Sequence, residues 1–232
     1  MNLFYQPLIP DGIHYLDAAE SKHSAKVLRK RNGDQIQITD GKGFLYNAVI
    51  TNEDVHKCAF TIQEKIESPI RPYYIHIAIA PTKNTDRLEW FIEKSIELGV
   101  DHITLIECDH NERSHLKFER LEKLAISAMK QSLKFLLPSI SGPVKLSDVI
   151  LNATETEKFI AYVDPENKIH LKKAAVSNSS YLVLIGPEGD FSKNELALAQ
   201  QNHFKKVSLG PSRLRTETAG LAACHILNLV NT

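Results

Sequence analysis

The sequence predicts an α/β protein in which a parallel sheet layered with helices follows a smaller β-rich region. Five short apolar runs alternate with helical patterns, which is typical of strand–helix–strand units. These runs lie near residues 74–80, 103–106, 159–163, 181–185 and 206–209. Before them, residues 35–62 alternate apolar and polar side chains between turn signals, as short antiparallel strands do. Two prolines in the extended stretch 68–72 separate the two patterns, so we expect domains at 1–68 and 73–232.

Composition narrows the class of protein. The 232 residues are 43% hydrophobic with a formal net charge of zero, which supports a packed core and argues against indiscriminate coating of nucleic acid. No apolar run approaches the roughly 20 residues that span a bilayer, and the amino terminus lacks a secretory-signal pattern. Cys58, Cys108 and Cys224 are far apart and show no metal-ligand spacing. We therefore expect a cytoplasmic protein with no membrane segment, no disulfide framework and no metal site.

The amino-terminal region predicts a small barrel. Apolar side chains alternate with polar ones along three runs, and residues 40–43 and 52–54 supply turn signals between them. The alternating positions are Ile36 and Ile38, then Phe44, Tyr46, Ala48 and Ile50, then Cys58, Phe60 and Ile62. A helix is predicted ahead of these strands, over residues 17–30.

A basic cluster lies within and just after this predicted helix. Residues 22–31 contain five Lys or Arg side chains and no acidic residue. Clusters of this kind supply sequence-independent contacts to nucleic-acid phosphates. The alternative is a solvated helix end whose cations complement the helix dipole.

The helices of the second region have recognisable ends. Asp86 and Glu89 form a predicted capping box for a helix through Leu98, and Gly99 suits the position after its end. A second helix is predicted over residues 117–135, followed by a loop at 139–143. Ser147 is a candidate cap for a short helix, and residues 168–176 predict another.

Two glycine loops stand out near the carboxyl terminus. Gly186-Pro187 follows the apolar run 181–185, and Gly210-Pro211 follows a second run, so two neighbouring parallel strands would present both loops at one sheet edge. Ligands bind at that edge of open parallel sheets, and glycine lets backbone approach a ligand closely. Helices are expected from Lys193, with a Ser192–Glu195 capping box, and from residue 216 or 217. The loop at 186–189 matches neither a dinucleotide fingerprint nor a P-loop, so the motif alone does not identify a ligand. The alternative is that the two loops are ordinary strand-to-helix turns.

These loops carry a family resemblance. IGPEGDFS at 185–192 and LGPSRLRTETA at 209–219 resemble signature segments of the bacterial ribosomal RNA uridine-N3 methyltransferases, the RsmE family of the SPOUT superfamily. Residues 83–100, 112–114 and 23–29 are similar to further family segments, so the resemblance covers nearly the whole chain. Two departures stand out: Asp190 replaces a usual glycine, and KQSLK at 130–134 replaces a usual Glu-Gln-x-Gly-Arg.

The resemblance implies a particular version of the α/β fold. We expect a SPOUT-type parallel sheet with a carboxy-terminal trefoil knot, preceded by a PUA-like β-barrel that binds RNA. From physics alone an ordinary unknotted sheet is expected, because threaded chains are rare. The resemblance also implies a homodimer, with the helix at 217–230 in the interface. Residues available for it are Ala222, Ala223, Ile226, Leu227 and Val230, although these could equally pack on the chain's own sheet.

The resemblance further implies methylation of N3 of a uridine in 16S ribosomal RNA of the small subunit, with S-adenosyl-L-methionine as cofactor. The implied cofactor-binding residues are Ile185, Gly186, Glu188, Gly189, Leu209, Gly210, Leu214, Thr218 and Ala219. Arg215 and Glu217 are the catalytic candidates, although they could instead form a local pair at the helix start. The RNA-binding candidates are Lys26, Arg29, Arg31, Lys83, Arg87 and Arg113, each of which could be an ordinary exposed charge.

Other functions remain open at this point. A non-catalytic RNA-binding protein with a degenerate SPOUT domain is one, and Asp190 is the departure that favours it. A methyltransferase acting on another RNA, such as transfer RNA, is the second. A nucleotide-dependent enzyme is the third, and the absence of a phosphate-loop motif argues against it.

Overall fold

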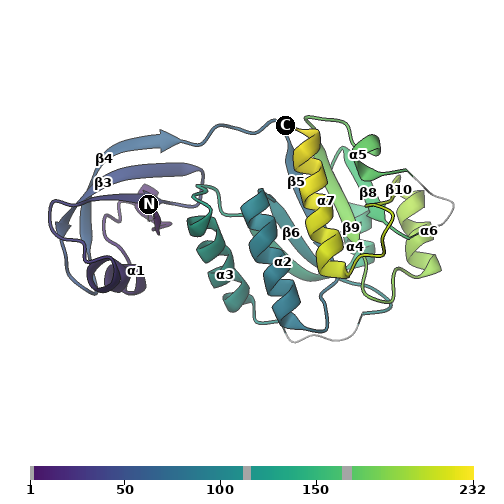
Figure 1. Ribbon diagram of the computed structural model, residues 1–232, viewed down its shortest axis with the longest axis horizontal. Coiled ribbons are helices and arrows are strands. Elements are labelled where there is room, and N and C mark those ends of the chain that lie inside the picture. Colours follow the sequence, from purple (N-terminus) through teal and green to yellow (C-terminus); the bar gives the residue numbers. More distant parts are fainter. Residues whose placement is uncertain (1–2, 112–115, 164–168) are drawn as a thin grey trace. The chain divides into compact units, whose positions relative to one another are not determined.

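The computed structural model describes residues 3–111, 116–163 and 169–232. Contacts divide the chain into two compact units, one of residues 1–70 and 126–137 and the other of residues 71–125 and 138–232. Figure 1 shows the elements of both units, coloured along the chain. No helix in the described part of the chain is long and apolar enough to cross a membrane.

The first unit contains a four-stranded sheet in the order β1-β2-β3-β4. Its strands are β1 (Leu3–Tyr5), β2 (Gln35–Thr39), β3 (Phe44–Asn52) and β4 (Ala59–Glu67). β1 pairs with β2 in parallel, and the other pairs are antiparallel. The alternating apolar residues of β2 and β3 are buried, as their spacing predicts, except for the half-buried Phe44 at the start of β3.

The two edges of this sheet come together, which produces the predicted small barrel. After the single turn η1 (Ile9–Asp11), the chain runs beside β4: Leu16 N donates to Cys58 O at 2.9 Å, and Phe60 N donates to His14 O at 3.0 Å. The Gln6 side chain, just beyond β1, donates to Tyr15 O at 2.6 Å. The amino-terminal segment therefore contacts both edges of the sheet.

The helix predicted over residues 17–30 is shorter than expected. Asp17 caps α1 (Ala18–Lys22), which continues into the π-helical segment η2 (His23–Val27). Arg29 has a left-handed backbone, with φ of 55°, and such a conformation ends a helix. The basic cluster therefore lies half on the helix and half on the loop after it.

Residues 126–137 pack in the first unit although their sequence pattern predicts a place in the second domain. They include the end of α3 (Phe118–Gln131). Lys130 forms an ion pair with Glu20, and Gly43 N donates to Phe135 O at 2.9 Å. Leu133, at the usual glycine position of the family, has φ of 54°. Leu133 therefore adopts a left-handed backbone conformation that the usual glycine would adopt more easily.

The second unit contains a six-stranded parallel sheet in the order β10-β8-β9-β5-β6-β7. Its strands are β5 (Tyr74–Ile79), β6 (His102–Glu107), β7 (Ser139–Lys145), β8 (Glu157–Ala161), β9 (Ser180–Ile185) and β10 (Lys205–Val207). The central strands β5 and β9 are buried over most of their length, which accounts for their continuous apolar runs.

Helices cover both faces of this sheet (Figure 1). α2 (Thr85–Leu98) and α7 (Thr216–Val230) pack side by side on one face, where α7 lies over β5 and β9. On the other face, α4 (Leu146–Asn152) and α6 (Lys193–Gln201) share a buried cluster with β5, β6, β8 and β9. The short helix α5 (Leu171–Ala174) precedes β9. The arrangement confirms the predicted α/β layers, whereas the trefoil knot stays a prediction.

Two predictions about the strands are wrong. Residues 139–143 form most of β7 rather than a loop, because an edge strand that is largely accessible needs no apolar pattern. Gly142 allows close strand pairing there, since a Cβ atom would lie 2.3 Å from Leu105 O. The strands that carry the two glycine loops, β9 and β10, are also not neighbours, because β8 lies between them.

The predicted helix caps have mixed outcomes. Ser192 and Glu195 form the predicted capping box, and Gly99 ends α2 with φ of 96°. The prediction of a capping box at Asp86 and Glu89 is wrong. Asn84 caps α2 instead, and its side chain accepts a hydrogen bond from Asp86 N at 2.9 Å. Ser147 does not cap α4, since that helix already begins at Leu146.

Candidate active site

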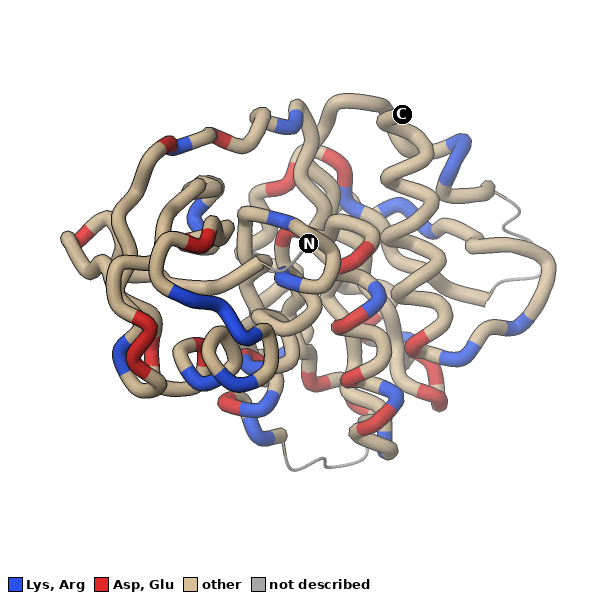
Figure 2. Tube along the Cα trace, turned by 60° about the vertical axis from the view of Figure 1, so that its left-hand side comes forward, with Lys and Arg blue, Asp and Glu red and all other residues tan. Residues whose placement is uncertain are grey.

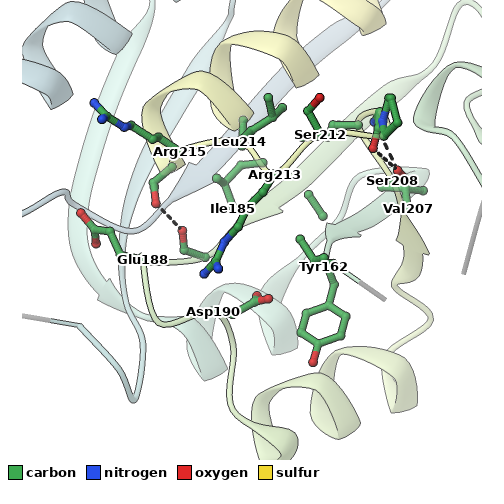
Figure 3. Close-up of a pocket in the computed structure, with 18 of the residues that line it drawn as sticks. Tyr162, Ile185, Glu188, Asp190, Val207, Ser208, Ser212, Arg213, Leu214 and Arg215 are labelled. Atoms are coloured by element: carbon green, nitrogen blue, oxygen red, sulfur yellow. Dashed lines mark hydrogen bonds between the residues drawn. The ribbon is translucent and has the colours of Figure 1, made fainter. Parts of the chain in front are cut away.

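A cavity of about 790 Å³ opens at the carboxyl ends of β8, β9 and β10. Two loops form most of its lining, the first after β9 and the second between β10 and α7 (Figure 3). A third part comes from residues 161–163, at the end of β8. The topology therefore brings three strand ends to one cavity, where the sequence indicated two.

The first loop is held by backbone hydrogen bonds. Asp190 N donates to Pro187 O at 2.9 Å, which closes a tight turn, and Phe191 N donates to Asp190 Oδ1 at 2.9 Å. Asp190 has φ of 61°. Aspartate tolerates this left-handed conformation better than most residues, because its short side chain bonds locally. Asp190 therefore adopts a backbone conformation that the usual glycine also adopts readily, and it adds a carboxylate.

The second loop is tied to the first at the start of α7. Thr216 Oγ1 donates to Gly186 O at 3.1 Å, shown as a dashed line in Figure 3. Farther from α7, Gly210 N donates to Ser208 Oγ at 3.2 Å, and Gly210 has φ of 140°. The Thr216 contact therefore joins the two loops, and the Ser208 contact holds the turn within the second loop.

Most of the predicted cofactor residues line this cavity. They are Ile185, Gly186, Glu188, Leu209, Gly210, Leu214 and Ala219. Gly189 and Thr218 are not among the lining residues. Gly189 instead lies against His110: a Cβ atom added at Gly189 would be 3.1 Å from the Cβ atom of His110. The backbone at Gly189 can therefore shape the loop without facing the cavity.

Several other residues that were not named as cofactor candidates also line the cavity, although five of them lie within the two glycine loops at 185–189 and 209–219. They are Ala161, Tyr162, Val163, His170, Pro187, Asp190, Val207, Ser208, Pro211, Ser212, Arg213 and Thr216. For the β8 residues, the apolar run at 159–163 was the available signal, but only the strand order places its end between the two loops. Arg213 lies within the resembling segment 209–219, and Ser208 directly precedes that segment. Their position in the sequence was therefore an available signal.

The two catalytic candidates lie in different environments. Arg215 is exposed, lines the cavity and sits at the N-cap position of α7. Glu217 is only 7% exposed and is not among the lining residues. Its carboxylate lies 3.9 Å from Arg87 Nε on α2. In the described part of the chain, Glu217 therefore pairs with Arg87 and not with Arg215.

The remaining RNA-binding candidates fall in both units. Lys26, Arg29 and Arg31 are exposed in the first unit, and Arg31 pairs with Glu53 at 3.1 Å. Residues 29–31 form the longest run of basic residues in the sequence. Figure 2 shows the Lys and Arg positions of the chain in blue. Lys83 is exposed in the second unit. Arg113, with the resembling segment 112–114, lies outside the described residues.

Local electrostatics distinguish the titratable groups near the cavity. Partial burial raises the pKa of Asp190, opposed by the hydrogen bond from Phe191 N and by the charges of Arg213 and His110. Burial also raises the pKa of the Cys108 thiol far above its usual range, so this thiol stays protonated at neutral pH. Among the described residues, no group of three or more His, Cys, Asp or Glu side chains is arranged to hold a metal.

Comparisons with known proteins agree with this architecture. Residues 69–228 match a family model for an RNA methyltransferase domain, and residues 16–63 match a model for an RNA methyltransferase PUA domain. The ribosomal RNA small subunit methyltransferase E of Aquifex aeolicus is 29% identical over 231 residues, which cover 98% of this chain and 99% of the relative.

Two solved structures are similar over the full chain. A probable rRNA-methyltransferase from Porphyromonas gingivalis is 43% identical, with a TM-score of 0.92 and 99% of each chain covered. The ribosomal RNA small subunit methyltransferase E from Neisseria gonorrhoeae, solved with S-adenosyl methionine, is 25% identical with a TM-score of 0.85. That match covers 100% of this chain and 98% of the Neisseria chain. The family resemblance is thus confirmed, and the chain belongs to the RNA methyltransferase family that includes the ribosomal RNA small subunit methyltransferases E.

Proposed function

We propose that this protein transfers a methyl group from S-adenosyl-L-methionine to N3 of a uridine in 16S ribosomal RNA of the small subunit. The observation that carries the proposal is the cavity at the carboxyl ends of β8, β9 and β10. Its two loops are the segments that resemble the signature segments of the family. Since that reaction uses cytoplasmic ribosomal RNA, we also propose a cytoplasmic location.

The lining of the cavity suits this cofactor. A volume of about 790 Å³ lies within the usual range for small-molecule sites. Leu209 and Leu214 offer an apolar surface for the adenine ring, while Glu188, Asp190 and Arg213 offer charge for polar groups. We propose that the predicted cofactor residues that line the cavity contact the cofactor. Gly189 and Thr218, which do not line it, would support the shape of the loops without contacting the cofactor. When bound, S-adenosyl-L-methionine supplies a methyl group that its sulfonium already makes electrophilic.

The chain's own residues then have to prepare the uridine. N3 carries a proton and lies on the pairing edge, so the base must be unpaired or swung out of a helix. Loss of that proton to solvent water leaves negative charge on N3 and the uracil carbonyl oxygens. Two observations support a role for Arg215 in this step: it is exposed at the cavity, and it forms no ion pair among the described residues. We propose that it stabilises the developing anion.

Glu217 is better suited to positioning than to accepting the proton. It is buried, does not line the cavity, and lies beside Arg87. We propose that Glu217 orients Arg87, leaving the guanidinium of Arg87 able to contact RNA phosphate. Replacing Glu217 with Gln should then raise KM for RNA more than it lowers kcat, and the reverse split would assign Glu217 to the chemical step.

A direct test uses small ribosomal subunits from a strain that lacks this modification. The protein is mixed with these subunits and S-adenosyl-L-methionine, and the digested RNA is searched for N3-methyluridine by mass spectrometry. Appearance of N3-methyluridine supports the reaction, the cofactor and the substrate together. Cofactor binding without this product would refute the proposed substrate, and failure to bind the cofactor would favour a non-catalytic RNA-binding protein.

Arg215→Ala is the corresponding mutational prediction. Loss of one donor to a developing oxyanion costs about 10²- to 10³-fold in rate, so the variant should lose that much turnover while cofactor affinity changes little. Lys123→Ala is a matched control, because Lys123 is an exposed cation on α3 outside the cavity. Unchanged turnover of Arg215→Ala would remove Arg215 from the catalytic groups.

We also propose that the protein is a homodimer with α7 in the interface. Ala223 and Leu227 are fully buried within their own unit, so they are not available to a partner. Ala222, Ile226 and Val230 are half-buried and Leu229 is 51% exposed, which leaves an apolar strip on the outer side of the helix. Leu229→Glu should shift the sedimentation coefficient to that of a monomer, and a monomeric parent protein would refute the proposal.

A further inference from the structure

We propose that Asp190 and Arg213 recognise the α-amino-acid end of S-adenosyl-L-methionine, with Asp190 binding its ammonium group and Arg213 its carboxylate. This inference rests on the proposed function. It assigns a role to Asp190, the residue that replaces the usual glycine in the first loop, and to Arg213, which sequence reasoning left without one. Both residues line the cavity.

The carboxylate of Asp190 is held in place before any ligand arrives. Its backbone N donates to Pro187 O at 2.9 Å, and His110 Nδ1 donates to its backbone O at 2.9 Å. One side-chain oxygen, Oδ1, accepts from Phe191 N at 2.9 Å. In the described part of the chain, the other oxygen, Oδ2, has no hydrogen-bond partner. A fixed, half-buried carboxylate with a free oxygen is a preorganised site for a cationic group.

Arg213 brings the opposite charge from the second loop. Figure 3 shows its side chain reaching across the cavity toward Asp190. The guanidinium has no ion pair within hydrogen-bonding distance among the described residues, yet its charge lowers the pKa of Asp190. A planar guanidinium can bind a carboxylate through two parallel hydrogen bonds.

The two charges together specify the kind of group that fits. A carboxylate and a guanidinium on opposite loops are complementary to a zwitterion, and an α-amino acid is the zwitterionic part of the proposed cofactor. The apolar side chains of Leu209 and Leu214 supply a separate surface for the adenosine part. Burial raises the pKa of Asp190, and a bound ammonium group would offset that cost of ionisation. An RNA phosphate on Arg213 is the competing assignment, and it leaves Asp190 without a role.

The test compares three ligands by isothermal titration calorimetry. S-adenosyl-L-methionine and S-adenosylhomocysteine both carry the amino-acid end, whereas 5′-methylthioadenosine lacks it. The variants are Asp190→Asn and Arg213→Gln, each of which removes one charge. Asparagine also tolerates the left-handed backbone and keeps an acceptor for Phe191 N, so the loop should fold normally. Asp190→Gly is a second folding control, and Lys172→Gln, an exposed residue on α5, is the matched control for charge.

We expect each charge-removing variant to bind S-adenosyl-L-methionine and S-adenosylhomocysteine about 10-fold or more weakly, because charge-assisted hydrogen bonds are removed. Binding of 5′-methylthioadenosine should change by less than about 2-fold. Equal losses of affinity for all three ligands, or none, would overturn the assignment. A loss confined to S-adenosyl-L-methionine would overturn it too, since the pair would then sense the sulfonium. If the parent protein bound 5′-methylthioadenosine but neither S-adenosyl-L-methionine nor S-adenosylhomocysteine, both the proposed function and this assignment of Asp190 and Arg213 would be refuted.

Discussion

Gly220 lies in the second turn of α7, where this helix packs on α2 and β5. A Cβ atom at this position would lie 2.6 Å from Phe91 Cε2 and 2.9 Å from Ile79 Cδ1. Carbon atoms in contact are normally about 3.5–4.0 Å apart. The Ile79 methyl is the end of a flexible side chain and can turn away. The Phe91 ring is fully buried, so it cannot move without displacing its neighbours.

Two opposing effects set the outcome of Gly220→Ala. Alanine is the better helix former, by about 1 kcal/mol at an exposed helical position. Overpacking a close-packed core costs about 1–3 kcal/mol. We therefore expect a net loss of about 1 kcal/mol in the free energy of unfolding. For a protein of this size, that loss lowers Tm by roughly 2–4 °C.

The measurement is urea denaturation of the parent and the variant, followed by circular dichroism. The control is the same substitution in a Phe91→Leu background, where the ring that meets the new methyl group is gone. There Gly220→Ala should become neutral or stabilising, and the difference between the two backgrounds is the coupling energy. If Gly220→Ala stabilises the parent protein, the close packing of α7 on α2 is not what requires glycine.

Two further predictions concern pH and RNA. Burial, and then the neighbouring His76, lower the pKa of His102 to about 4, whereas the unfolded chain has the ordinary value of 6.5. The unfolded state therefore takes up the proton first, so Tm should fall as pH drops from about 6.5 toward 4. This fall in Tm should be smaller in His102→Gln. Equal slopes of Tm against pH in the parent protein and the variant would refute the prediction. In the first unit, replacing Lys26, Arg29 and Arg31 together with Ala should weaken RNA binding and flatten its salt dependence, by about one unit of slope for each phosphate that the variant no longer binds. An unaltered slope would reassign these residues to solvated surface.

Local chemistry explains what could be predicted from the sequence. The apolar runs of β5 and β9 predict buried parallel strands because most side chains there are removed from water on both faces of the sheet. Ser192 and Glu195 predict a helix start because the two groups satisfy each other's backbone donors within one turn. Gly186 and Gly210, at the ends of two such runs, indicated the loops that line the cavity.

Local chemistry was insufficient where a distant neighbour decides the conformation. β7 has no apolar pattern, and its pairing depends on the close approach of Gly142 to Leu105 on β6. Asn84 rather than Asp86 caps α2, because both residue types cap helices and only the backbone path selects one. Glu217 lies beside Arg87, a partner on another helix, in place of the nearby Arg215.

By itself, the sequence determined the alternation of strands and helices, the β-rich amino-terminal region and the two glycine loops, because each depends on residues close together in the chain. Only the tertiary structure decided that β8 lies between β9 and β10, that Tyr162 therefore joins the cavity, and that Asp190 and Arg213 lie across it from each other. Strand order depends on how crossover connections pack against the sheet. Contacts between residues far apart in sequence select that packing, and no local pattern encodes it.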